Sequence, residues 1–214
     1  MIKLTNEDNM ALMARYPDGY FDLAIVDPPY GLGKRTTSGG GGKNKQSEKW
    51  ENHDWDNSIP NAKYFDELKR VSKNYIVWGG NYMIEYLNNC RCFITWDKMV
   101  FIPTMSRIEL ALTSFDKLPE LVQINNNDPQ RQHPTQKPVA LYKWILSKYA
   151  KQGDKILDTH LGSMSIAIAC YDLGFDLVGA ELDSEYYQKG LERVNNHINQ
   201  SNLFIPHQEI ITEI

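Results

Sequence analysis

The 214-residue sequence has few cysteines, no excess of positive charge and no long apolar run. Cys90, Cys92 and Cys170 form an odd set without the paired spacing of a metal site, which indicates reduced thiols in a cytoplasmic protein. Lys and Arg total 23 against 27 Asp and Glu, so the formal charge is −4 and any contact with nucleic acid must be local. No apolar run is long enough to span a bilayer, and residues 1–8 carry no apolar signal core. We therefore expect a soluble cytoplasmic protein with neither a membrane contact nor a metal site.

What is present is an alternation of short apolar runs with helical patterns. The runs predict strands at 22–26, 75–78, 92–96, 108–112, 155–157 and 177–180, several of them too hydrophobic to have a wet face. The clearest helical patterns cover residues 61–71, 139–149, 164–173 and 184–198. This alternation predicts an α/β fold with an open, mainly parallel sheet. With 42% hydrophobic residues, the chain 1–214 fits a single domain.

The segment Asp27-Pro28-Pro29-Tyr30 directly follows the apolar run 23–26. The exocyclic amine of a purine is a poor nucleophile because its lone pair is delocalised, and two hydrogen-bond acceptors would make it more reactive. Asp27 and the Pro28 carbonyl can supply these acceptors, the prolines restrict the backbone, and Tyr30 offers a ring for stacking. The segment therefore predicts a slot for an adenine base. A strand end followed by an ordinary proline turn is the alternative.

Residues 31–60 break the alternating pattern and are rich in Gly, Ser, Asn and charge, which predicts a long mobile loop. The loop is the one strongly basic stretch, and it lies beside the predicted base slot. We expect it to contact DNA phosphates, and a solvated connector is the alternative. The candidate DNA-binding residues are Lys34, Arg35, Lys43, Lys45 and Lys49.

A second motif follows the predicted strand at 155–157. There Asp158 precedes a turn containing Gly162 and Ser163, and Glu181 ends the next strand about twenty residues later. An acidic residue at that distance suits ribose hydroxyls. The turn lacks the full glycine pattern that a dinucleotide pyrophosphate needs, so a nucleoside cofactor fits better than a nicotinamide one. An ordinary strand-to-helix turn is the other interpretation.

The third motif is the hexapeptide that runs from His133 to Pro138. Its two prolines favour extended backbone before them, so His133, Thr135 and Lys137 are expected to project to one side. A hydroxyl and a cation there can hold the carboxylate end of an amino acid. A plain helix-entry turn explains the prolines equally well.

Together, these three motifs in this order resemble the amino-group DNA methyltransferases that use S-adenosylmethionine, in the arrangement in which the catalytic segment precedes the cofactor segment. The segments 78–82 and 93–98 also resemble the strand ends that line the target pocket in adenine methylases of phages and restriction-modification systems. The resemblance covers nearly the whole chain. It implies a Rossmann-like, doubly wound, mainly parallel sheet, circularly permuted, with an antiparallel strand.

The resemblance also implies roles. Asp27, Pro28, Pro29 and Tyr30 match the catalytic motif, with Asp27 between cofactor and base. The residues that match the cofactor site are Asp158, Gly162, Ser163 and Glu181, with His133, Thr135 and Lys137 at the methionine end. The implied reaction is methyl transfer from S-adenosylmethionine to N6 of a flipped-out adenine in DNA. N4 of cytosine is the nearest rival target, and a non-catalytic, cofactor-binding subunit is the alternative from another class.

Two departures from the family pattern stand out. His160 replaces the usual aromatic residue and Met164 replaces a glycine, and either change is expected to crowd or reshape the adenosine pocket, with weaker cofactor binding as a consequence. Only about 116–132 is left free for a target-recognition insert. A restriction endonuclease partner, or none, is compatible with the sequence.

Overall fold

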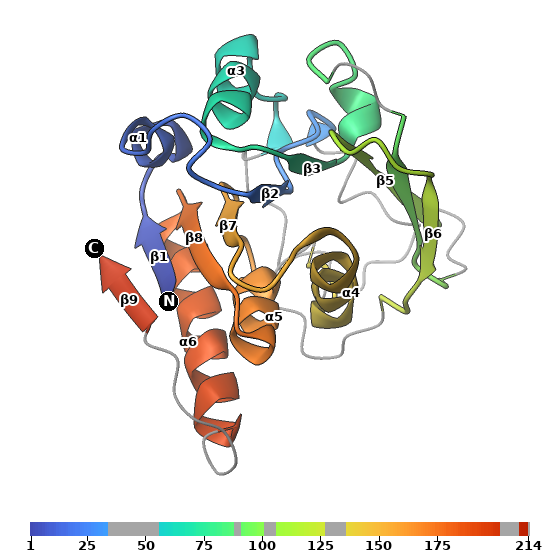
Figure 1. Ribbon diagram of the computed structural model, residues 1–214. Helices are drawn as coiled ribbons and strands as arrows, with labels where there is room; N and C mark the ends of the chain where they lie inside the picture. Colours follow the sequence, from blue (N-terminus) through green and yellow to red (C-terminus); the bar gives the residue numbers. More distant parts are fainter. Residues whose placement is uncertain (34–55, 88–90, 101–105, 127–135, 202–209, 214) are drawn as a thin grey trace.

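The computed structural model describes residues 1–33, 56–87, 91–100, 106–126, 136–201 and 210–213. In this part of the chain nine strands form one sheet in the order β6-β4-β5-β3-β2-β7-β8-β1-β9 (Figure 1). The strands are β1 (Ile2–Asn6), β2 (Leu23–Val26), β3 (Tyr75–Trp78), β4 (Phe93–Asp97), β5 (Ile108–Thr113), β6 (Glu120–Gln123), β7 (Lys155–Asp158), β8 (Asp176–Glu181) and β9 (Ile210–Glu213).

All neighbouring strands pair in parallel except at β5, which runs antiparallel to both β3 and β4. The prediction of a mainly parallel sheet with an antiparallel strand is confirmed. The sheet also brings distant segments together, because β2 pairs with β7 in the register Leu23↔Ile156 and Ala24↔Leu157. The strand before the first motif therefore lies beside the strand before the second.

Helices cover both faces of the sheet, with α4, α5 and α6 on one side and α1 and α3 on the other (Figure 1). The helices are α1 (Asn9–Ala14), α3 (Ala62–Val71), α4 (Val139–Tyr149), α5 (Ser165–Leu173) and α6 (Ser184–Ser201), with a short 3-10 helix, η3 (Gly80–Tyr82). Carboxylate or amide oxygens cap the helices α1, α3 and α6. Asp8, Asn61 and Asp183 accept hydrogen bonds from the free N–H groups of the first turns.

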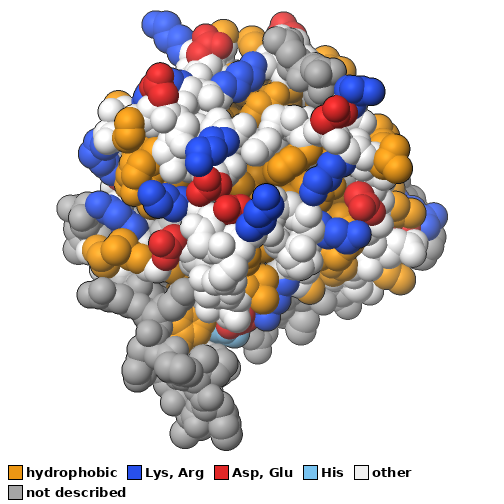
Figure 2. Space-filling view, viewed as in Figure 1, with side chains coloured by type: hydrophobic (Ala, Val, Ile, Leu, Met, Phe, Trp, Pro, Cys, Tyr) orange, Lys and Arg blue, Asp and Glu red, His pale blue; other side chains and the backbone are white. Residues whose placement is uncertain are grey.

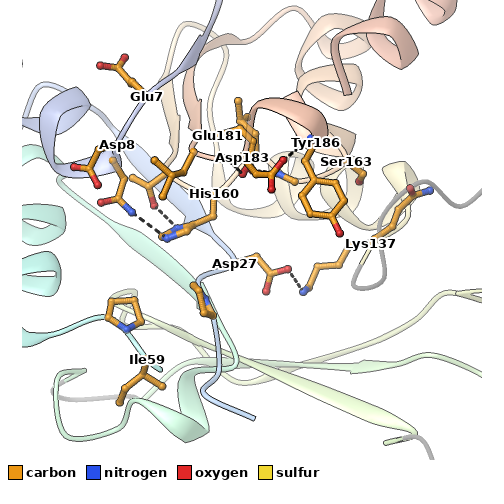
Figure 3. Close-up of a pocket in the computed structure, with 18 of the residues that line it drawn as sticks. Glu7, Asp8, Asp27, Ile59, Lys137, His160, Ser163, Glu181, Asp183 and Tyr186 are labelled. Carbon is orange, nitrogen blue, oxygen red and sulfur yellow. Dashed lines mark hydrogen bonds and ion pairs between the residues drawn. The ribbon is translucent and has the colours of Figure 1, made fainter. Parts of the chain in front are cut away.

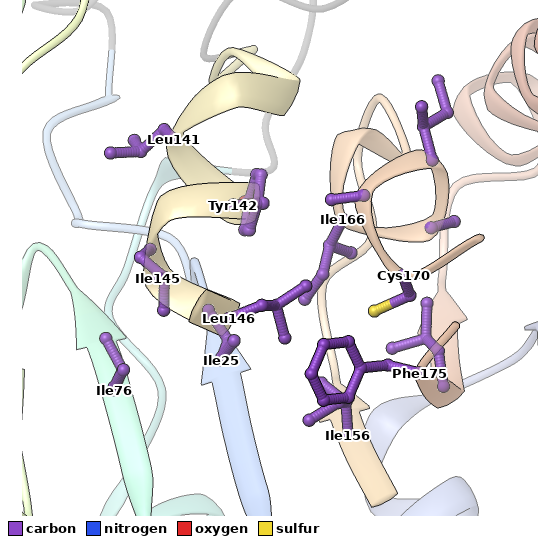
Figure 4. Packing of buried hydrophobic residues seen from close by; sticks show 14 of the residues in the cluster. Ile25, Ile76, Leu141, Tyr142, Ile145, Leu146, Ile156, Ile166, Cys170 and Phe175 are labelled. Atoms are coloured by element: carbon purple, nitrogen blue, oxygen red, sulfur yellow. The ribbon is translucent and has the colours of Figure 1, made fainter. Parts of the chain in front are cut away.

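Strand β2 shows why two layers of helices are needed. Its side chains alternate between two cores: Leu23 and Ile25 join the cluster under α4 and α5, whereas Ala24 and Val26 join the cluster under α1 and α3. Figure 4 shows the first cluster, where Ile145 and Leu146 of α4 face strand residues such as Ile156. A strand buried on both faces reads as a continuous apolar run, and this is how β2 was recognised in the sequence.

Three strands and one helix were not predicted, namely β1, β6, β9 and α1. The expectation that residues 116–132 stand free of the sheet is wrong for 120–123, because β6 pairs in parallel with β4. Leu118 and Leu121 are 85% and 63% exposed, so this strand lacked the buried apolar run that marks the others. Residues 127–132 lie outside the described part of the chain.

The surface agrees with a chain of near-balanced charge. On the face shown in Figure 2, basic and acidic side chains are interspersed among apolar ones. Within the described ranges, the helices are all too short or too polar to cross a membrane.

Candidate functional site

A cavity of about 460 Å³ opens at the carboxyl ends of β2, β7 and β8, where open α/β sheets bind ligands (Figure 3). The structure brings residues of all three predicted motifs to this cavity. Six predicted site residues line the cavity: Asp27, Pro29, Lys137, Gly162, Ser163 and Glu181. Pro28, Tyr30 and Asp158 are not among the lining residues, although each is next to or in contact with one of them in the sequence or the fold, and Asp158 is 1% exposed.

Asp27 is held by two neighbours. Lys137 Nζ lies 2.5 Å from Asp27 Oδ2, and the Tyr30 hydroxyl lies 2.6 Å from Asp27 Oδ1. Both neighbours also contact Glu109 of β5: its Oε1 is 3.0 Å from Lys137 Nζ and 2.5 Å from the Tyr30 hydroxyl. Asp27 and Glu109 thus share one cation and one hydroxyl.

The charges in this cluster, formed by Asp27, Tyr30, Glu109, Lys137 and Lys98, are set by burial and by each other. Burial raises the pKa of Asp27, and Lys137 opposes this shift. Burial also disfavours the ionised form of Glu109, but the ammonium groups of Lys137 and Lys98 lower its pKa to about 2. The Lys137 ammonium is buried, yet its two carboxylate partners raise its pKa above the ordinary value.

The ring of Tyr30 packs against two residues that follow β3, Tyr82 and Gly79. It stacks on Tyr82 of η3 with a centroid distance of 5.3 Å and an interplanar angle of 21°. It also lies against Gly79, where an added Cβ would be 2.1 Å from Tyr30 Cε1. Gly79 has φ +64°, so its lack of a side chain serves both the backbone turn and the ring. The predicted stacking of a base on Tyr30 remains a prediction.

On the other side of the cavity, Glu181 is fixed at the end of β8. Its Oε2 accepts a hydrogen bond from the Gly162 N–H at 2.7 Å, and its Oε1 accepts one from the Asp183 N–H at 3.0 Å. Burial raises the pKa of Glu181, and these backbone donors oppose the shift. Each carboxylate oxygen has a further lone pair, so Glu181 can accept hydrogen bonds from ligand hydroxyls.

Two titratable groups lie at the end of β7: Asp158 is buried, and His160, which follows the strand, is half-buried and lines the cavity. Burial raises the pKa of Asp158 to about 8 and lowers that of His160 to about 4. Asp158 Oδ1 accepts the His160 N–H at 2.9 Å, so this carboxyl orients the turn from behind the wall. The Asn9 amide donates to His160 Nε2 at 3.0 Å, which leaves the proton on Nδ1, 2.9 Å from Thr159 Oγ1. His160 is thus a neutral, fixed ring in the cavity wall.

Met164 does not line the cavity, so the expectation that it crowds the pocket is wrong, whereas an effect on the shape of the pocket stays a prediction. The residue is fully buried and has left-handed backbone dihedrals, φ +57° and ψ +29°, which explains why a glycine would suit the position. Its side chain packs against Gly190 of α6, where an added Cβ would lie 2.7 Å from Met164 Cγ. The missing side chain of Gly190 therefore makes room for Met164.

Other predicted residues lie outside the described part of the chain. These are His133 and Thr135 of the third motif, and the candidate DNA-binding residues Lys34, Arg35, Lys43, Lys45 and Lys49. Their roles stay predictions. Of the third motif, Lys137 is described, and its contacts are with Asp27, Glu109 and Tyr30. Its role at the methionine end of a cofactor also stays a prediction.

Sequence reasoning missed Glu109 and Asn9. Glu109 has a signal in the sequence, because it is the one charged residue in the otherwise apolar run 108–112. A charge inside a predicted strand marks a position that needs a partner. Asn9 carries no comparable signal, since it reaches His160 only after β1 and α1 place it at the cavity rim.

The comparisons agree with this geometry. A family model described as DNA methylase matches residues 77–192, more than half of the chain. Among curated relatives, the type II methyltransferase M.HpaI of Haemophilus parainfluenzae is 26% identical over 83% of this chain and 69% of its own length. The DNA adenine methyltransferase YhdJ of Escherichia coli is 38% identical over a shorter stretch, 32% of this chain and 23% of its own length.

Solved structures share the fold. The complex of M1.HpyAVI with SAM has a TM-score of 0.60 and 18% identity, covering 91% of this chain and all of that one. The cytosine-N4-specific PvuII DNA methyltransferase has a TM-score of 0.62 and 13% identity, covering 92% of this chain and 91% of that one. With the family match over the region from the end of β3 through β8 to the first half of α6, the chain belongs to the DNA methylase family.

Proposed function

We propose that the protein transfers a methyl group from S-adenosylmethionine to N6 of adenine in DNA. The observation that carries the proposal is that Asp27, Gly162, Ser163 and Glu181 line one cavity (Figure 3). A base on the Asp27 side and a cofactor on the Glu181 side would meet there. Had the two motifs faced different sides of the sheet, methyl transfer between their ligands would be impossible.

The residues on the Glu181 side fit a nucleoside with an attached amino acid. Glu181 can accept from ribose hydroxyls, and the neutral ring of His160 and the ring of Tyr186 line the same wall. A cavity of about 460 Å³ is within the ordinary range for a small-molecule site. S-adenosylmethionine, when bound, supplies a methyl group on a sulfonium sulfur.

The residues on the other side suit an exocyclic amine. Among the described residues, Lys137 contacts one oxygen of Asp27 and the Tyr30 hydroxyl contacts the other, so each oxygen keeps a lone pair for an amino N–H. The Pro28 carbonyl is the second acceptor that we assign. Accepting these hydrogen bonds increases electron density on the amino nitrogen. With S-adenosylmethionine bound, this nitrogen would attack the methyl carbon in line as the carbon–sulfur bond breaks, without a covalent enzyme intermediate. S-adenosylhomocysteine would leave, and one amino proton would be released through Asp27 to solvent. Burial of the acceptors strengthens the effect, and positioning supplies much of the rate.

Adenine is favoured because the motif begins with Asp27, whereas N4-cytosine enzymes more often begin it with Ser. One relative, YhdJ, is named as an adenine methyltransferase. The structural likeness to the cytosine-N4-specific PvuII enzyme makes cytosine the alternative. The alternative of a non-catalytic subunit rested partly on Met164 at the cofactor turn. That argument is weaker because Met164 lies outside the cavity lining.

The test measures tritiated methyl incorporation into unmethylated genomic DNA, followed by mass spectrometry of the nucleosides. We expect N6-methyladenine from the native protein and a loss of about a hundredfold or more in Asp27→Ala, with cofactor binding by calorimetry nearly unchanged. Asp18→Asn is the matched control, because this carboxylate is exposed and pairs with Arg70. N4-methylcytosine would redirect the proposal to cytosine. An active Asp27→Ala variant, or a native protein that labels no DNA, would overturn it.

A further inference from the structure

We propose that Glu109 is a positioning residue for methyl transfer, which orients Asp27 and sets its charge through two shared partners, Tyr30 and Lys137. The inference rests on the proposed function, because it concerns the carboxylate assigned to the amino group. It adds a residue from β5, a strand that carries none of the three motifs.

The geometry of the shared partners carries the argument. Lys137 Nζ lies 2.5 Å from Asp27 and 3.0 Å from Glu109, and the Tyr30 hydroxyl lies 2.6 Å and 2.5 Å from the same two groups. A phenol has one hydrogen, so the two carboxylates compete for the same donor. Moving or neutralising Glu109 must therefore change the hydrogen bonds that Asp27 accepts from Tyr30 and Lys137.

The direction of β5 explains why this residue reaches the site. The parallel strands have their carboxyl ends at the edge of the sheet where the cavity opens. Strand β5 runs in the opposite direction, so its first residues lie at that same edge. Trp78 at the end of β3 pairs with Ala111, and the Gly79 N–H donates to the Leu110 carbonyl at 2.8 Å. Glu109, the second residue of β5, is thus placed beside the turn that holds Tyr30.

Burial makes the arrangement sensitive to charge. The side chain of Lys137 is 2% exposed, and those of Asp27 and Glu109 are each 14% exposed. Lys98 at the end of β4 neutralises the other side of Glu109, with Nζ 3.0 Å from Oε2. Without Glu109, Lys137 would pair with Asp27 alone. A carboxylate that is more fully paired is a weaker acceptor for the amino group.

The effect on the pKa of Asp27 has a definite sign. Among the described residues, the cation Lys137 lowers the pKa of Asp27 and the anion Glu109 raises it. Removing that anion, and leaving Lys137 to Asp27, both act to lower this pKa. Other titratable groups that act on or with Asp27 stay the same in a Glu109 variant. In the described part of the chain they are Asp158 at the end of β7, Tyr64 of α3, Tyr142 of α4 and Tyr30 itself.

The experiment compares Glu109→Gln with the native protein in single-turnover methylation across pH. We expect the rate to fall about tenfold to a hundredfold, with cofactor affinity unchanged, and the acidic limb of the rate profile to move to lower pH. Glu109→Asp keeps the charge at a shorter reach, so its limb should lie nearer the native position. The matched control is Glu185→Gln, since that side chain is 66% exposed on α6.

A merely structural role for Glu109 would weaken cofactor binding and stability but leave the acidic limb in place, and that result overturns the inference. A native rate in Glu109→Gln also overturns it, while the proposed function stands. A second measurement, by NMR, does not depend on methylation activity. The carbon-13 carboxyl signal of Asp27, assigned by its loss in Asp27→Asn, should titrate at lower pH in Glu109→Gln than in the native protein. An unchanged or higher midpoint contradicts the inference, even if the native protein methylates no DNA.

Discussion

The ammonium of Lys137 lies 2.5 Å from the carboxylate of Asp27, although 110 positions separate the two residues in the sequence. Lys137 lies shortly before the start of α4, and Asp27 directly follows β2. The same ammonium lies over the rings of Trp78 and Tyr30, at 5.2 Å and 5.8 Å from their centroids. One buried cation thus joins the segment Asp27–Tyr30 to the end of β3.

Replacing Lys137 with methionine should destabilise the fold. The change leaves the carboxylates of Asp27 and Glu109 buried together without their shared cation, and removal of one partner of a buried pair costs about 3 kcal/mol or more. The free energy of unfolding, measured with urea at pH 7, should fall by about that amount, and the deficit should shrink at acidic pH as a carboxylate takes up a proton.

Lys148→Met is the control for this change. Lys148 also pairs with a carboxylate, that of Glu120, but both side chains are well exposed, so we expect a small change in the free energy of unfolding. Equal losses in the two variants would show that the buried pairing of Lys137 does not stabilise the fold.

The strands that are buried on both faces could be predicted from the sequence. Strands such as β2, β3 and β7 read as apolar runs because helices cover both of their faces. Strand β1 was missed because Lys3 and Thr5 interrupt its apolar residues, and β6 because Leu121 is exposed at the edge of the sheet. Six residues in α1 are too few to show a helical period.

The candidate site was predictable where its residues are neighbours in the sequence. Asp27 and Tyr30 are three positions apart, and Gly162 and Ser163 are adjacent. Glu109 could not be connected to them from the sequence. It contacts Tyr30, which is 79 positions away, and Lys137, which belongs to a different motif. These contacts depend on the antiparallel direction of β5, and a pattern of apolar runs gives no strand direction.

The stability of the fold should decrease as pH rises above about 6.5, and Asp158 is the cause that we expect. Its pKa in the fold is about 8, raised by burial, against about 3.8 in the unfolded chain. A group with a raised pKa stabilises the fold fully below its unfolded value, and this contribution is lost as pH rises through about 8. His160, with its pKa lowered to about 4, acts in the opposite direction below 6.5, so the two effects offset each other there.

Asp158→Asn isolates this effect. An amide oxygen can still accept the His160 N–H, but the side chain no longer titrates. Urea unfolding at pH 6.5, 7.5 and 8.5 should show a decline in the native protein and a flatter profile in the variant. Parallel profiles would mean that Asp158 is ionised in the fold at neutral pH.

A methyl group at position 79 should displace Tyr30 and so disturb the predicted catalytic segment Asp27–Tyr30. Gly79 has φ +64°, and a Cβ there would lie 2.1 Å from Cε1 of Tyr30, so the ring would have to leave its place between Gly79 and Tyr82. The hydrogen bond between the Tyr30 hydroxyl and Asp27 would then be lost. We expect Gly79→Ala to reduce DNA methylation about tenfold or more.

Gly19→Ala separates this displacement from backbone strain. Gly19 has nearly the same φ, +63°, but its nearest neighbour to an added Cβ is Lys73 Cγ at 3.8 Å, an ordinary contact. Both variants carry the left-handed strain of about 1 kcal/mol, and Gly79→Ala alone displaces the ring. The free energy of unfolding should therefore fall in both, whereas methylation should fall only in Gly79→Ala. Equal methylation in the two variants would show that the position of Tyr30 does not govern the reaction at Asp27.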